Sequence, residues 1–278
     1  MNPTDGPGRS RYQLASVTLP GIRYLSAGMR HMGVLVCACL LFACASQTPQ
    51  SPPGPAGVVL DPAAERYTVA LLGATGMVGG HLLREALARG HAIRALARNP
   101  DKLDEFRDQI TIIAGDARDP RVIETLLRGS DVVVSALGPA KSDGDAARFI
   151  NTTVSANVIR EAQSRGISRY LLVSGAAVVM PGDERNLLGW WIRTLARLGL
   201  RSALQDKQAE YELLAESQLD WMLVRCPLID PEPFSRAALV SLETPPAFRL
   251  RAGELARFMI DQIGAREYSR QGPFLGSD

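Results

Sequence analysis

Short apolar runs alternate with amphipathic stretches from about residue 67 to the C-terminus. The runs are rich in Val, Ile and Leu, as parallel strands buried on both faces require, and the stretches between them repeat apolar positions at helical spacing. Strands are predicted at residues 67–72, 92–97, 109–116, 131–138, 169–176 and 219–227, and helices at 81–90, 149–165 and 188–200. With right-handed crossovers, this alternation predicts an α/β fold, a Rossmann-type doubly wound parallel sheet with helices on both faces.

Residues 1–66 lack the alternation, so we expect a single folded domain at residues 67–278 behind an N-terminal segment. In that segment, an apolar run at 32–43 follows two basic residues, Arg23 and Arg30, and has the length of a signal-peptide core rather than of a transmembrane helix.

The apolar run leads to Cys44 through a sequence that resembles a bacterial lipobox, and the Pro-rich residues 45–57 are typical of a disordered tether. These features predict a lipid anchor at Cys44 and a membrane-anchored domain on the exported face. In the alternative interpretation the protein is cytoplasmic, and the whole segment is an upstream extension with a misassigned start.

A glycine-rich turn follows the first predicted strand, with the sequence Gly73-Ala-Thr-Gly76-Met-Val-Gly79. The first glycine permits a tight turn, the second lets a pyrophosphate approach the backbone N–H groups of a helix N-terminus, and the third lets helix and strand pack closely. Gly-x-x-Gly-x-x-Gly is by itself weak evidence for a dinucleotide site. Here the predicted strand before it and the predicted helix after it match the strand–turn–helix order of such sites. The turn therefore predicts a dinucleotide-binding site.

Arg98 stands at the end of the second predicted strand, and no acidic residue does. In NAD-preferring domains a carboxylate at this place accepts hydrogen bonds from the ribose 2′-OH, whereas an arginine there suits a 2′-phosphate. Lys102 adds a second positive charge nearby. The sequence therefore predicts that NADP(H) is preferred over NAD(H).

The composition of the chain excludes several classes of binding partner and site. With 31 basic and 29 acidic residues the net charge is only +2, and the charges form no basic stripe, so nucleic acid is not an expected partner. Three of the four cysteines lie before residue 45, and Cys226 alone lies in the folded part, so no disulfide is expected there. No His, Cys or acidic trio has metal-ligand spacing, so no metal site is expected. The oligomeric state stays open.

Over residues 67–278 the chain resembles the atypical short-chain dehydrogenase/reductases, specifically the NAD(P)H-binding group that includes flavin/biliverdin reductases and NmrA-like proteins. The motifs that carry the resemblance are the glycine turn, Arg98-Asn-Pro, Gly115-Asp116, Asn157, Tyr170-Leu-Leu-Val-Ser174, Lys207-x-x-Glu210 and Asp220-Trp-x-x-x-Arg225-x-Pro227.

The resemblance implies where the cofactor lies: Asp116 by the adenine, residues 135–138 along the ribose and pyrophosphate, and Ser174 near the nicotinamide. Lys207 and Ser174 are the candidate catalytic residues. The residues expected to bind the cofactor are Gly73, Thr75, Gly76, Met77, Val78, Gly79, Arg98, Asp116, Ala117, Ser135, Ala136, Leu137, Gly138 and Lys207.

The usual proton donor of short-chain dehydrogenases is missing. In their Tyr-x-x-x-Lys motif the lysine lowers the pKa of the tyrosine hydroxyl, but here Ala203 stands four residues before Lys207, and Tyr211 four residues after it. Either Lys207 holds the nicotinamide ribose or exchanges the proton itself, or hydride passes to a flavin, a quinone or a related small molecule that needs no protein donor. The other alternative is a regulatory or scaffolding domain without turnover, as in NmrA-like proteins.

The N-terminal segment makes a testable prediction. Since basic residues precede the apolar run and none follows before Arg66, the charge bias places the folded domain across the membrane. A lipidated cysteine carries two or three acyl chains, enough for stable anchoring, so Cys44→Ser is expected to release or mislocalise the domain. A C-terminal reporter enzyme that is active only outside the cytoplasm measures export. A silent reporter on the intact chain would contradict it.

Overall fold

The computed structural model describes residues 65–139, 144, 148–184, 186–199 and 201–278. The predicted signal-like run, the lipobox and Cys44 lie outside these residues, so they stay predictions. Within the described part of the chain, no helix combines the length and the apolar character needed to cross a membrane.

The centre of the fold is an eight-stranded sheet in the order β3-β2-β1-β4-β5-β6-β10-β8. All neighbours in it are parallel except β8, which runs antiparallel to β10. Strands β7 and β9 form a separate parallel pair. The strands are β1 (Thr68–Leu72), β2 (Ala92–Ala97), β3 (Thr111–Ala114), β4 (Val132–Ser135), β5 (Arg169–Gly175), β6 (Asp220–Cys226), β7 (Leu228–Asp230), β8 (Leu239–Ser241), β9 (Arg249–Arg251) and β10 (Phe274–Gly276).

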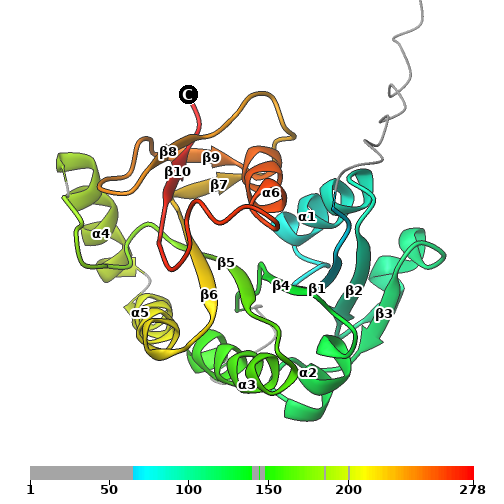
Figure 1. Ribbon diagram of the computed structural model, residues 1–278. Helices are drawn as coiled ribbons and strands as arrows, with labels where there is room; N and C mark the ends of the chain where they lie inside the picture. The colour runs from blue at the N-terminus through cyan, green and yellow to red at the C-terminus, as the bar shows by residue number, and fades with distance from the viewer. Residues whose placement is uncertain (1–64, 140–143, 145–147, 185, 200) are drawn as a thin grey trace, which may run out of the picture. The chain divides into compact units, whose positions relative to one another are not determined.

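Helices cover both faces of the sheet, with α1 and α6 on one face and α2, α3 and α5 on the other (Figure 1). The alternation of side chains along a buried strand explains the two layers: Val69 and Leu71 pack towards α1 and α6, whereas Ala70 and Leu72 pack towards α2 and α3. The doubly wound fold is thus confirmed. The helices are α1 (Met77–Ala88), the 3₁₀ helix η1 (Pro100–Phe106), α2 (Pro120–Leu127), α3 (Ile150–Arg165), α4 (Leu187–Gly199), α5 (Arg201–Glu216) and α6 (Ala252–Asp261).

Several elements depart from the apolar pattern. The strand expected at 109–116 is only β3, because Gln109 and Ile110 both donate backbone hydrogen bonds to Phe106 and close the turn after η1. The pattern does not predict α2, which is eight residues long and begins with Asp119-Pro120. The side chain of Asp119 accepts a hydrogen bond from the backbone N–H of Arg121 and caps that helix. Helix α6 and strands β7 to β10 are also absent from the predicted set.

A buried aspartate of α5 caps the start of α3. The residue before α3, Phe149, supplies no side-chain cap. In its place the fully buried carboxylate of Asp206 accepts hydrogen bonds from the backbone N–H groups of Asn151 and Thr152, each at 2.9 Å, and from both of their side chains. These bonds satisfy donors that a helix start leaves open, and they join elements that are 54 and 55 residues apart.

A second buried charge ties the C-terminal residues to the sheet. Arg225 of β6 is 2% exposed and pairs with Asp183 at 2.6 Å. Its Nε donates to the carbonyl of Gly272 at 2.7 Å, and its guanidinium lies 3.6 Å from the ring centroid of Phe274 in β10. A buried guanidinium is tolerated only when it is paired and hydrogen-bonded, so these contacts depend on one another.

The Asp206 cap makes a prediction about stability. Asp206→Ala leaves two backbone donors at the start of α3 without their acceptor, and we expect it to lower the free energy of unfolding by about 2–4 kcal/mol, measured by chemical denaturation. Asp104→Ala is the matched control, because Asp104 pairs with Arg107 on the exposed surface, and its replacement is expected to leave the free energy of unfolding nearly unchanged. Equal effects of the two replacements would contradict the role of the cap.

Candidate functional site

The glycine turn brings three backbone segments together after β1. Gly73 has a φ of +81°, and a Cβ on it would lie 2.7 Å from the carbonyl oxygen of Ala136. A Cβ on Gly79 would lie only 1.9 Å from the carbonyl oxygen of Gly73. Gly76 is the N-cap of α1 and has no side chain over the first turn, so ligand atoms can approach the N–H groups there. The turn is therefore shaped for close approach by a ligand.

A cavity of about 420 Å³ opens beside this turn, at the carboxyl ends of β1, β2, β3 and β4. Ligands of doubly wound sheets bind at this edge, where the strand order reverses between β1 and β4. The structure brings most of the predicted cofactor residues to the cavity wall. Those that line it are Gly73, Thr75, Gly76, Met77, Val78, Arg98, Asp116, Ala117, Ala136, Leu137 and Gly138.

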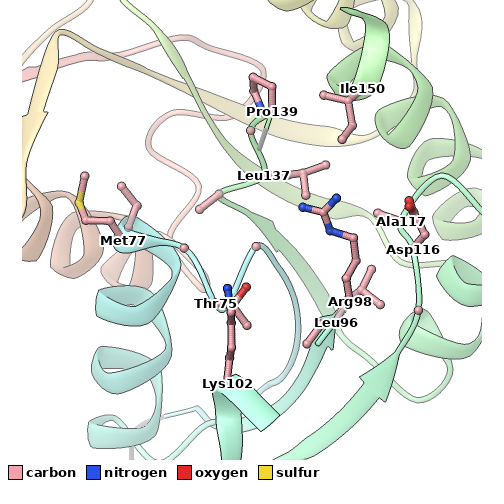
Figure 2. A pocket seen from close by; sticks show the side chains of 17 residues that line it. Thr75, Met77, Leu96, Arg98, Lys102, Asp116, Ala117, Leu137, Pro139 and Ile150 are labelled. Atoms are coloured by element: carbon pink, nitrogen blue, oxygen red, sulfur yellow. The ribbon is translucent and has the colours of Figure 1, made fainter. Parts of the chain in front are cut away.

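Two cationic side chains reach the cavity from β2 and η1. In Figure 2 the guanidinium of Arg98 extends towards Leu137 and Ala117, and the Lys102 side chain rises towards Thr75. Thr75, Arg98, Asn99 and Lys102 also line an adjoining recess of about 360 Å³. The recess thus has two positive charges and two uncharged polar side chains, which is a setting for an anion.

Asp116 lines the cavity just after β3. Arg118 donates to its carboxylate from Nε at 3.0 Å and from Nη2, and the backbone N–H of Arg118 donates at 2.9 Å. The Arg118 hydrogen bonds lower the pKa of Asp116 to about 2, with a smaller contribution from the charge of Arg98. Asp116 therefore stays ionised and can accept hydrogen bonds from a ligand amine.

Four predicted site residues do not line the cavity. Gly79 serves the packing of α1 against the turn. Ser135 is buried, and its hydroxyl accepts a hydrogen bond from the backbone N–H of Leu137 at 3.3 Å, beneath the cavity wall. Ser174 and Lys207 lie further along the sheet edge, at the end of β5 and on α5.

Two contacts hold the ammonium of Lys207, one to β5 and one within α5. Its ammonium donates to the carbonyl of Val173 at 3.0 Å and pairs with the buried carboxylate of Glu210 at 2.8 Å. The next residue of the strand, Ser174, is 4% exposed, and its hydroxyl has no hydrogen-bond partner among the described residues. A buried hydroxyl without a partner is costly, so this position is suited to a bound polar group.

A chain of buried hydrogen bonds runs on from Glu210. The hydroxyl of Ser155 donates to Glu210 at 2.7 Å and lies 3.0 Å from the hydroxyl of Tyr170. Tyr170 is completely buried, and this burial raises the pKa of its hydroxyl. The sequence analysis did not predict that Ser155 and Tyr170 take part in these hydrogen bonds. The one sequence signal for such a network was the Lys207-x-x-Glu210 spacing, which places both side chains on one face of a helix.

No described tyrosine takes the place of the missing proton donor beside Lys207. Tyr211 packs edge-on against Trp221, with ring centroids 6.0 Å apart, and lines a different hollow together with Arg225. Tyr170 is kept protonated by its burial. Cys226 is also buried, which raises the pKa of its thiol and makes it a core residue rather than a nucleophile.

Comparison with curated proteins finds relatives over part of the chain. A ceramide reductase from Caulobacter vibrioides is 30% identical over 118 residues, which are 42% of this chain and 37% of that protein. An uncharacterised protein from Mycobacterium bovis is 26% identical over 161 residues, which are 58% of this chain but only 15% of that protein. The chain thus spans much less than half the length of these curated relatives.

Solved structures share the fold over most of the described chain. ChuY, an anaerobilin reductase from Escherichia coli, superimposes with a TM-score of 0.63 at 22% identity over 76% of this chain and 96% of ChuY. A short-chain dehydrogenase/reductase from Veillonella parvula in complex with NADP gives 0.60 at 20% identity over 76% of this chain and 95% of that one. At these identities the likeness concerns the fold alone.

The family model described as NAD(P)H-binding matches residues 73–266, from the first glycine of the turn to the end of α6 and beyond. Together with the sheet order and the cavity beside the glycine turn, this match confirms the resemblance drawn from the motifs. The chain belongs to the NAD(P)H-binding family.

Proposed function

We propose that this protein is an NADP(H)-dependent oxidoreductase that reduces a flavin, a quinone or a related small molecule. The observation that carries the proposal is the recess beside the cofactor cavity, lined by Arg98 and Lys102 with no carboxylate in its described lining. A 2′-phosphate is the part of NADP(H) that such a recess would hold.

The cavity fits the cofactor at three places. The glycine turn would receive the pyrophosphate at the start of α1, where a Cβ on Gly73 would collide with Ala136 in the loop after β4. Asp116, ionised at neutral pH, would accept from the adenine amine. Arg98 would offer a planar fork of N–H donors to phosphate oxygens, which Lys102 supplements as a point charge.

The proposed acceptor follows from the residues near Ser174. The nicotinamide supplies the hydride when the cofactor is bound. Lys207 would hold the ribose or the substrate oxygen with its ammonium, which Glu210 and Val173 keep in place. Ser174 would supply its buried hydroxyl to the nicotinamide or to the substrate. Since no described tyrosine stands ready to donate a proton, an acceptor that takes its proton from water suits the site best.

One observation favours a second candidate function, a regulatory or scaffolding protein that binds the nucleotide without turnover. The ammonium of Lys207 is already engaged by Glu210 at 2.8 Å, as a purely structural lysine would be. The two functions differ in whether purified protein oxidises NADPH in the presence of an acceptor.

The proposed function makes a prediction about cofactor preference. Arg98→Ala should weaken NADPH binding by about 1.5–3 kcal/mol, the contribution of a hydrogen bond to a charged group, and leave NADH binding nearly unchanged. Titration calorimetry with both cofactors measures the difference. Arg107→Ala is the control, since Arg107 is an exposed arginine just past η1 that lies outside the cavity lining. Equal losses for the two cofactors in Arg98→Ala would remove the basis of the NADP(H) assignment.

The second prediction concerns catalysis. We expect the protein to oxidise NADPH with FMN or menadione and to have little activity on simple alcohols or ketones. Lys207→Ala should lower kcat/KM for the flavin or quinone about tenfold or more, because the hydrogen bonds of a charged group are lost. Stopped-flow recording of NADPH absorbance gives the rates. Strong secondary-alcohol oxidation that survives Lys207→Ala would show that the active site lies elsewhere.

A further inference from the structure

A second cavity of about 510 Å³ lies between α4, α5 and the segment that follows β5. Helix α5 forms one wall of it with residues spaced by three and four, which therefore share one face of the helix. The lining residues are Val179, Arg193, Arg201, Leu204, Gln205 and Gln208.

This cavity is built on the two elements that carry the candidate catalytic residues. Gln208 follows Lys207 on α5 and holds Val179 by two hydrogen bonds. Its side-chain oxygen accepts from the backbone N–H of Val179 at 3.0 Å, and its side-chain nitrogen donates to the carbonyl of Val179 at 3.1 Å. Val179 lies five residues beyond Ser174, so the segment after β5 is fixed to α5 at this point.

The same turn of α5 also contacts the cofactor side. Asp206 holds the first turn of α3, whose first residue, Ile150, lines the cofactor cavity. Gln205, the residue before Asp206, lines the second cavity. One turn of α5 therefore contacts both the second cavity, through Gln205, and the helix that contributes Ile150 to the cofactor cavity, through Asp206, and Lys207 is the next residue.

Charge gives the second cavity its chemical character. Two of its lining residues are arginines, two carry carboxamides, and the described lining contains no carboxylate. Arg193 crosses from α4 to the carbonyl of Ala177 with an N···O distance of 3.3 Å, and it keeps its positive charge in that contact. Leu204 and Val179 add apolar surface. Guanidinium groups with carboxamides beside them suit a phosphate or a carboxylate, and the apolar surface suits a ring.

We propose that the second cavity holds the oxyanion of the substrate, a phosphate or a carboxylate carried on an aromatic acceptor, and that Arg201 and Arg193 bind it. The proposal rests on the proposed function for the hydride transfer, and it adds the substrate class. Arg201 is an exposed residue of the cavity lining and would bind the oxyanion from α5, while Arg193 would bind it from α4, where it also contacts the segment after β5.

FMN and riboflavin test the proposal, because they differ only in the phosphate. With the full chain and saturating NADPH, we expect wild-type protein to prefer FMN. Arg201→Gln should lower kcat/KM for FMN about fivefold and leave riboflavin unchanged, which is the effect expected of one partly exposed charge pair. Arg201→Glu should lower it further. Arg236→Ala, which removes an exposed arginine paired with Asp278 outside both cavities, should change neither flavin.

Two results would overturn the proposal: equal losses for both flavins, or no loss with FMN in either Arg201 variant. Arg193→Ala also removes the contact with Ala177, so this variant is judged only by the ratio of kcat/KM for FMN to kcat/KM for riboflavin. A general loss of folded protein does not change that ratio.

A binding measurement separates this proposal from the proposed function. If neither flavin is reduced, quenching of FMN fluorescence in saturating NADP⁺ reports the cavity directly. Weaker FMN binding in Arg201→Gln, with riboflavin binding unchanged, would support the oxyanion site although the reductase function fails. Equal FMN binding by wild type and both Arg201 variants would overturn the site itself.

Discussion

At Gly73 three stretches of backbone pass closer together than any side chain would permit. The loop after β4 lies where a Cβ of Gly73 would be, and α1 approaches the Gly73 carbonyl so closely that Gly79 has no room for a Cβ either. These contacts set the start of α1 directly over the end of β1. The cavity, its open N–H groups and the approach of Arg98 from β2 all depend on that placement.

The predictable part of this molecule is local in the sequence. Buried parallel strands appear as apolar runs, and the glycine turn and Arg98 are read directly because their neighbours in the chain determine their geometry. Short elements are missed, as α2 is: it has only eight residues, although its buried Ile123, Leu126 and Leu127 lie at helical spacing and Asp119-Pro120 marks its first turn. Ser135 shows that position at a strand end does not by itself identify a ligand contact. Its strand ends at the cavity, but its hydroxyl accepts a hydrogen bond from the backbone N–H of Leu137 and does not line the cavity.

What the sequence does not yield is contact between distant segments. The series of hydrogen bonds from Glu210 through Ser155 to Tyr170 joins α5, α3 and β5, which come together only in the folded protein. Asp206 caps a helix through Asn151, which lies 55 residues earlier, and Arg193 and Arg201 line one cavity with Val179. Lys207 illustrates the consequence: the motif locates it, but only the structure shows that a buried carboxylate and a strand carbonyl hold its ammonium.

The contacts of Arg225 make β6 depend on a segment far along the chain. The guanidinium is buried in β6, yet two of its partners, the Gly272 carbonyl and the Phe274 ring, come from a segment that begins 47 residues later. The ribosome makes that segment after β6, so Arg225 can be buried with both of these contacts only once residues 272–274 have also been made. A single arginine thus couples the completion of β6 to the later arrival of β10.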